Sequence, residues 1–402
     1  MLNKFFRSFF IQRLLVSGLT YLAYLYMAHH MGAGLYGKIA FLIFFLKSLN
    51  AMGFGLNYGL LFYAYHSKHD DYLKSYFIAY ALIGLSIILL GTFLISPLVF
   101  YLGPLVLLFV ILDPLLKIKR IFVFTLFPEF ILAASFCLAY ILVNENRMLY
   151  NLSSIVVLHV LGCIFIFLYR SNISQINWRI KFHEYPFNLL KVKELIEKGF
   201  SSYLYLVALF AFLFLDRFFM KKMFPAEILG TCMLATQLAQ ASLFLMSSWN
   251  FTSLVDIGDL IKSKKLDSSV ILKRLFLTAL IGALPLLLIF FFLMKFNHRY
   301  FADYQSLSHI FAVISLGLYC SNLATCIAPI LFFHGKQQVA AYGLILCSIV
   351  VCVVYLLVPY MNIDYLTVLH INYLALSLSS IFTILYSIHI LNEVLMQKEI
   401  NI

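Results

Sequence analysis

Ionisable side chains inside long apolar stretches are the residues of this sequence whose chemistry is easiest to name. Lys47 stands near the middle of one such stretch, and other residues follow it at the spacing of one helix face: Asn50, Phe54 and Asn57. Arg13 begins a polar stripe in the preceding stretch. An ionised side chain at mid-bilayer costs roughly 2.5 to 3.5 kcal/mol, so each cation should face protein or a wet cavity. Together they predict a cationic lining suited to an anion, although Arg13 is equally well placed to reach the lipid headgroups.

Carboxylates near the ends of apolar stretches are candidates for taking up a coupling ion: Asp113, Glu129 and Asp216. An alternative for the first two is a local ion-pair cluster with Lys117, Lys119 and Arg120. Asp216 directly precedes Arg217, and adjacent residues on a helix point about 100° apart, so these two are expected to need different partners. The alternative for Asp216 is that it only holds the end of its helix.

The second half of the chain has polar stripes that are largely uncharged. Gln237 and Gln240 lie in one apolar stretch, and a later stretch holds another stripe: Ser308, Ser315, Tyr319 and Asn322. Such stripes suit a hydroxyl-rich ligand, and hydrogen bonding between helices explains them equally well. The histidines and cysteines lack the spacing of a metal site or a nucleophile, so we expect no metal, no cofactor and no enzyme activity.

Composition identifies the elements that must position these groups. Of 402 residues, 63% are apolar and 11% are charged, with a mean hydropathy of +0.96, whereas a soluble domain has roughly 25% charged residues. Several uncharged runs exceed the roughly 20 residues that cross a bilayer as a helix. We therefore expect an all-α polytopic membrane protein, with helices near residues 9–29, 36–58, 75–95, 98–116, 126–143, 150–169, 200–219, 229–251, 275–294, 306–332, 339–359 and 366–390.

Basic residues predict the orientation of these twelve spans. If both termini are cytoplasmic, twenty-one Lys and Arg residues fall on the inner side, and six fall outside: Lys38, Arg147, Lys221, Lys222, Lys295 and Arg299. The net charge of +12 therefore reflects topology, and no nucleic-acid partner is expected. The connection 170–198 is basic and reads as an amphipathic linker on the cytoplasmic face. It separates an N-terminal six-helix lobe, 1–169, from a C-terminal six-helix lobe, 199–402.

The two lobes read as copies of one unit. Shifted by 193 positions, Gly37 falls on Gly230, Lys47 on Gln240 and Asn57 on Asn250. Six spans return the chain to its starting side, so the copies form a parallel repeat. Transporters often contain such repeats, with the substrate site between the halves.

Three stretches carry a family resemblance: MGAGLYGKIAFLIFF with AMGFGLNYGLLFY, then DRFFMKKMFPAEILGTCMLATQLAQ, and the region from FNHRYFADYQSLSHI to FFHGKQQVAAYG. In these, and in span count over nearly the whole chain, the sequence resembles the Wzx O-antigen flippases of the MOP exporter superfamily. The resemblance implies two six-helix lobes in a V around a cavity with alternating access. It also implies translocation of undecaprenyl-pyrophosphate-linked oligosaccharides across the inner membrane, in polysaccharide biosynthesis and alongside polymerase machinery. Arg13 and Lys47 match positions where cations line the cavity of related flippases.

Two other classes of function stay open. A MATE-like drug or cation antiporter has the same fold but would be expected to carry an acidic cavity in the first lobe, where this chain has Arg13 and Lys47. A membrane O-antigen polymerase or ligase would be expected to have a large outer loop, whereas the longest connection here is internal. Uphill transport would need coupling to protons or sodium.

Overall fold

The computed structural model describes residues 2–49, 53–65, 69–118, 127–143, 147–168, 186–250, 257, 260, 267–333 and 336–400; within these ranges, the side chains of residues 2–14 are among those it leaves undescribed. Arg13 therefore lies in a described helix but its side chain falls outside the description. Asn50 and the linker residues 170–185 also lie outside the described residues.

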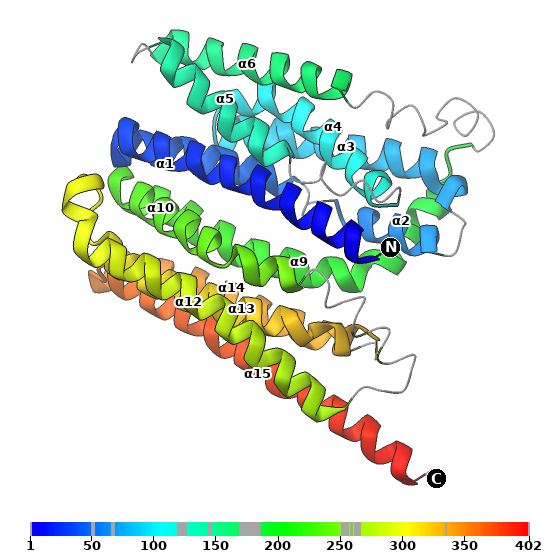
Figure 1. The fold of residues 1–402 in the computed structure, drawn as a ribbon. Helices are drawn as coiled ribbons and strands as arrows, with labels where there is room; N and C mark the ends of the chain where they lie inside the picture. Colours follow the sequence, from blue (N-terminus) through cyan, green and yellow to red (C-terminus); the bar gives the residue numbers. More distant parts are fainter. Residues whose placement is uncertain are drawn as a thin grey trace. The chain divides into compact units, whose positions relative to one another are not determined.

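The described part of the chain is helical and contains no strand (Figure 1). Its first elements are α1 (Leu2–Ser48), α2 (Leu56–Tyr65), the 3-10 turn η1 (His69–Tyr72), α3 (Leu73–Leu94), α4 (Leu98–Ile118), α5 (Phe127–Val143) and α6 (Arg147–Leu168). The later helices are α9 (Leu189–Met223), α10 (Ala226–Ser242), α12 (Ser268–Tyr300), α13 (Leu307–Phe333), α14 (Gln337–Met361) and α15 (Tyr365–Ile400).

Membrane-spanning helices dominate this architecture. Eight described helices are long and apolar enough to cross a membrane, and a ninth span results if the bent pair Ala226–Ser242 and Phe244–Asn250 is counted as one. Each of the twelve stretches expected to be spans contains a described helix. The prediction of an all-α polytopic membrane protein is confirmed.

The second expected span, 36–58, is not one continuous helix, and this part of the prediction was wrong. Residues up to Ser48 continue α1, which kinks at Gly32, where φ is 68°. A new helix begins at Leu56, after Phe54 and Gly55 adopt φ values of 47° and 82°. Side chains before and after this break therefore do not follow one helical face. Periodicity alone missed the break because the surrounding residues are almost all apolar.

Contacts between residues divide the chain into two compact units. Unit 1 comprises Met1–His30 and Ile39–Val207, and unit 2 comprises Met31–Lys38 and Ala208–Ile402. The division falls within α9, and residues 189–198 of the expected linker are the first turns of that helix. The assignment of two six-helix lobes joined by a linker stays a prediction.

Each unit is built around one central helix. In unit 1, α4 contacts α2, α3, α5 and α6; in unit 2, α13 contacts α10, α12, α14 and α15, and the last of these lies along it in Figure 1. These are the fourth and tenth of the expected spans, which correspond in a repeat of six. The helix breaks correspond as well. Helix α1 ends at Ser48, and the 193-residue shift carries this position to residue 241, next to Ser242, where α10 ends. The structure thus supports the internal repeat.

Two glycines related by the repeat contact each other inside unit 2. A Cβ atom on Gly37 would lie 2.6 Å from the backbone nitrogen of Gly230, and one on Gly230 would lie 1.9 Å from the carbonyl oxygen of Ala33. Only a hydrogen atom fits between these backbones. The segment Met31–Lys38 therefore packs on α10 at a distance that requires glycine on both sides.

We expect Gly230→Ala to destabilise the protein by about 1–3 kcal/mol, because overpacking against rigid backbone forces a shift of one segment. Gly18→Ala is the matched control, since a Cβ atom there meets nothing within 4 Å, and replacing an unconstrained helical glycine stabilises by roughly 0.5–1 kcal/mol. Thermal unfolding in detergent measures both variants. Equal melting temperatures for the two would contradict the close approach.

Candidate functional site

Lys47, near the end of the helical part of α1, forms an ion pair with Glu129 in the first turn of α5. The Nζ and Oε1 atoms are 2.5 Å apart, and each side chain is 30% exposed. The hydroxyl of Tyr24, which precedes the Gly32 kink of α1, lies 3.5 Å from the same carboxylate oxygen. The pair neutralises both charges while leaving both side chains partly exposed.

This pairing changes the expected neighbourhood of Glu129. The sequence suggested Lys117, Lys119 and Arg120 as partners, which are near in the chain but whose side chains lie outside the described residues. The partner that the structure describes is instead Lys47, which is distant in sequence. Two residues expected to act separately, one on substrate and one on a coupling ion, are therefore in direct contact.

Asn57 is the centre of a buried hydrogen-bonded cluster in unit 1. Its Oδ1 atom lies 2.6 Å from the hydroxyl of Tyr76, which is also 3.0 Å from the carbonyl oxygen of Ile111. Its Nδ2 atom donates to the hydroxyl of Tyr80 at 3.4 Å, and that hydroxyl donates to the carbonyl oxygen of Leu49 at 3.0 Å. The cluster satisfies backbone freed by the break between α1 and α2, so Asn57 has a structural task that accounts for its burial.

Asp113 of α4 lies in the same region of unit 1. It is 7% exposed and lies two residues after Ile111, whose carbonyl oxygen accepts from the hydroxyl of Tyr76. The carboxylate is thus on the inside of unit 1, beside the cluster around Asn57. Neither Asp113 nor Asn57 shares the accessibility of the Lys47–Glu129 pair.

Unit 2 contains a buried charged cluster around Asp216 and Arg217 of α9, whose side chains are 0% and 2% exposed. They form a direct ion pair, which the expectation of different partners for adjacent residues did not include. The long arginine side chain can fold back toward its neighbour. The angle of about 100° between adjacent residues describes only where the side chains start, so it did not predict this contact. Nor does α9 end here, because it continues to Met223.

Partners from three further helices form hydrogen bonds with this cluster. Asp216 Oδ1 accepts from the hydroxyl of Tyr355 on α14 at 2.9 Å and from Nδ2 of Asn372 on α15 at 2.8 Å. Arg217 donates to Thr236 Oγ1 on α10 at 2.6 Å and to the hydroxyl of Tyr373 at 2.7 Å. These four partners were missed from the sequence. A charge pair in an apolar stretch signals that partners must exist, but not which residues they are.

The uncharged candidates of the second half lie in different environments. Gln237 is 6% exposed, and its Oε1 atom has no hydrogen-bond partner among the described residues, whereas Gln240 is half-buried. Asn322, also half-buried, accepts a hydrogen bond from Asn250 Nδ2 on its backbone oxygen at 2.6 Å and donates from its own Nδ2 to the carbonyl oxygen of Leu318 at 2.9 Å. Gln237 thus has unused polar capacity, while Asn322 serves local hydrogen bonding.

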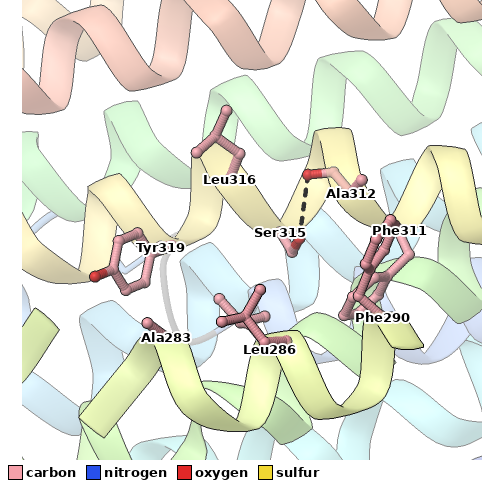
Figure 2. A pocket seen from close by; sticks show the side chains of 9 residues that line it. Ala283, Leu286, Phe290, Phe311, Ala312, Ser315, Leu316 and Tyr319 are labelled. Carbon is pink, nitrogen blue, oxygen red and sulfur yellow. Dashed lines mark hydrogen bonds between the residues drawn. The ribbon is translucent and has the colours of Figure 1, made fainter. Parts of the chain in front are cut away.

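A pocket of about 350 Å³ between α12 and α13 contains two members of the expected polar stripe, Ser315 and Tyr319 (Figure 2). Their hydroxyls are already used by backbone: Ser315 donates to the carbonyl oxygen of Ala312 at 3.1 Å, and Tyr319 donates to that of Ala279 at 2.9 Å. The rest of the lining is apolar, with Leu286 and Phe290 facing the pocket (Figure 2). The pocket is therefore suited to apolar groups and not to a sugar.

Metal-ligand chemistry has no support in the described residues, where no group of three or more His, Cys, Asp or Glu side chains could hold an ion. What the arrangement offers is charge recognition. Unit 1 presents a partly exposed cation and carboxylate, and unit 2 encloses a cation and carboxylate that are hydrogen-bonded to four further side chains.

Solved structures with this arrangement of helices are membrane transporters. Lipid II flippase MurJ, in an inward closed conformation, superposes with a TM-score of 0.71 at 15% identity, over 94% of this chain and 87% of that chain. The chain shares the fold of this solved transporter. An inward-facing multidrug-resistance MATE transporter of the MOP superfamily gives a TM-score of 0.59 and a MATE protein in the straight conformation gives 0.60, each at 12% identity and over 95% of this chain. These cover 99% and 94% of the MATE chains.

No protein-family model matches the sequence, and no curated protein matches it either. At identities of 12 to 15%, the likeness to solved structures is one of fold. Together with the eight long apolar helices among the described residues, this likeness indicates a multi-pass membrane protein.

Proposed function

We propose that this protein is a flippase that moves undecaprenyl-pyrophosphate-linked oligosaccharides, such as O-antigen repeat units, across the inner membrane by alternating access. The observation that carries the proposal is Lys47, a cation inside the membrane-spanning part of unit 1 whose side chain is still 30% exposed. A pyrophosphate needs such a cation when it leaves water, because charge-assisted hydrogen bonds offset the loss of hydration. The fold it shares with a lipid II flippase supports a lipid-linked substrate.

The other candidate residues would contribute to transport in different ways. Arg13 would add a second cation near the cytoplasmic mouth, and Asn50 a polar group close to Lys47 in sequence. Gln237 and Gln240 would contact the sugar, since Gln237 has an unused amide oxygen. Asn57 and Asn322 would act through the local structure that they hold. The polyprenyl tail would stay in lipid.

A coupling ion, proton or sodium, would need a carboxylate that changes its state during transport. Of the three candidates we place Glu129 first, because it is 30% exposed, whereas Asp113 is 7% and Asp216 0% exposed. Asp216 is also enclosed by Arg217, Tyr355 and Asn372. Exposure favours the carboxylate that can exchange with water.

A MATE-like drug or cation antiporter is the second candidate, favoured by the likeness to two MATE structures. A cationic substrate would have to displace Lys47 from Glu129, so the ion pair disfavours a cation at this position. An enzyme such as a polymerase or ligase is a weaker candidate, since the similar solved structures are transporters.

Reconstitution distinguishes these functions directly. Proteoliposomes containing the purified protein are loaded with a fluorescent undecaprenyl-pyrophosphate-linked sugar, and its appearance in the outer leaflet is followed by quenching. We expect translocation well above protein-free liposomes. Transport of a cationic dye against a pH gradient, without lipid translocation, would replace the flippase with the antiporter.

The proposed topology has both termini and the connection 170–198 in the cytoplasm. Single cysteines at Asn146 and Asn177, on a cysteine-free background, are expected to differ in labelling by an impermeant maleimide. From outside intact spheroplasts, the cysteine at 146 should react and the cysteine at 177 should not, because the twenty-one to six bias of basic residues places 177 inside. The reverse pattern would invert the orientation.

A further inference from the structure

The Lys47–Glu129 pair joins two helices that are distant in sequence, α1 and α5, at a contact of 2.5 Å. Both side chains remain 30% exposed, so neither is enclosed by protein. A lysine ammonium has three N–H donors, so Lys47 can hold Glu129 and still donate to an anion. The ion pair is therefore formed while both of its side chains stay partly exposed.

Two other ion pairs of the chain show how unusual this combination is. Asp216 and Arg217 are 0% and 2% exposed and are enclosed by further hydrogen bonds, so an anion cannot reach the guanidinium. Lys193 and Glu197, one turn apart on α9, are 71% and 59% exposed with 3.7 Å between charged atoms, and water screens them. The Lys47–Glu129 pair lies between these extremes, where charge interactions are strong and exchange is still feasible.

We propose that Glu129 is an internal competitor of the transported anion: its carboxylate neutralises Lys47 in the empty protein and yields this position to a phosphate group of the substrate. The inference rests on the proposed function and names the residue that would tune it. Because the carboxylate and the phosphate are both anions, Glu129 weakens substrate binding at Lys47 and so accelerates release. Lys47 is neutralised with or without substrate, which avoids an isolated cation in the membrane in either state.

If Glu129 competes with the substrate, removing its charge should tighten substrate binding, whereas removing it from a merely structural ion pair should not. Replacing Glu129 by Gln keeps the size and hydrogen-bonding capacity of the side chain and removes the charge. Binding of undecaprenyl pyrophosphate should become about tenfold tighter, the change expected when one like charge at short range is removed from a partly exposed site. Release should slow correspondingly, so that translocation falls while binding improves.

The experiment uses the full-length protein in nanodiscs, with undecaprenyl pyrophosphate as the probe and the dissociation constant and dissociation rate as readouts. Glu197→Gln is the matched control, since it also removes a carboxylate from a Lys–Glu pair but at an exposed site, and should bind as wild type does. Lys47→Ala combined with Glu129→Gln should lose the gain, because the competitor acts only through the lysine.

Tighter binding by Glu129→Gln, absent in the double variant, supports the proposal. Unchanged or weaker binding by Glu129→Gln overturns it, even if translocation is lost. If the Gln variant does not assemble, Glu129→Asp keeps the charge but draws it back from Lys47, and wild-type affinity and release in that variant likewise overturn the proposal. Failure of the wild-type protein to bind this lipid would contradict the proposed function itself, which is a different result.

Discussion

Arg217→Ala is expected to lower the stability of the protein by about 3–5 kcal/mol, the cost of leaving one member of a buried ion pair without its partner. The carboxylate of Asp216 is 0% exposed, so it cannot recover by hydration. Loss of the arginine also removes the Nη2 group that donates hydrogen bonds to the hydroxyls of both Thr236 and Tyr373. The apparent melting temperature in detergent should fall by on the order of 10 °C.

Arg299→Ala is the matched control, because this arginine is exposed near the end of α12; such surface changes stay within about 0.5 kcal/mol. Asp216→Asn should also destabilise, since it leaves the guanidinium buried opposite a neutral group. Combining Asp216→Asn with Arg217→Met removes both charges, and the double variant should be more stable than the sum of the single effects predicts. A melting temperature for Arg217→Ala equal to that of wild type would show that the buried pair contributes nothing.

Lys47→Ala has the second large expected effect, and it concerns transport instead of stability. We expect a fall in flipping of roughly 10- to 100-fold, the equivalent of one charge-assisted hydrogen bond to the pyrophosphate, so that a flippase-null strain is no longer complemented. Protein abundance should stay near that of wild type, because Glu129 is 30% exposed and can be hydrated when its partner is removed.

Lys47→Arg, which keeps the positive charge, should retain part of the activity, and Lys193→Ala, which removes an exposed lysine, should retain all of it. Surface polysaccharide normalised to the amount of protein in the membrane measures each variant. Normal polysaccharide from Lys47→Ala would remove this residue from substrate binding. A loss of protein in both Lys47 variants would instead make the lysine a packing element.

Composition and periodicity were sufficient for the class of fold. A chain with 63% apolar and 11% charged residues cannot expose its surface to water on all sides, and the bilayer requires the backbone to satisfy its own hydrogen bonds within each span. Helices therefore formed at each of the twelve expected stretches. The internal shift of 193 positions also had a physical basis, since the glycines that it pairs, Gly37 and Gly230, meet backbone to backbone.

The break between α1 and α2 could be predicted only in part from the sequence. The break before Leu56 depends on positive φ values at Phe54 and Gly55 and on the hydrogen bonds of Asn57 with two tyrosines of α3. A glycine in an apolar stretch is compatible with a straight helix as well as a turn. The partners that favour the turn come from a different helix, so the window of residues around the break did not contain the deciding information.

The sequence by itself determined which residues had to be accounted for: ions in apolar stretches are costly, and Lys47, Asp216 and Arg217 could be singled out for that reason alone. Only the tertiary structure decided how each one is neutralised. It brings Glu129 of α5 to Lys47 and leaves the pair accessible, and it encloses Asp216 and Arg217 among α10, α14 and α15. Charge and hydropathy are properties of single residues and can be read in order along the chain, whereas the pairing of an ion and its access to solvent depend on which helices pack together.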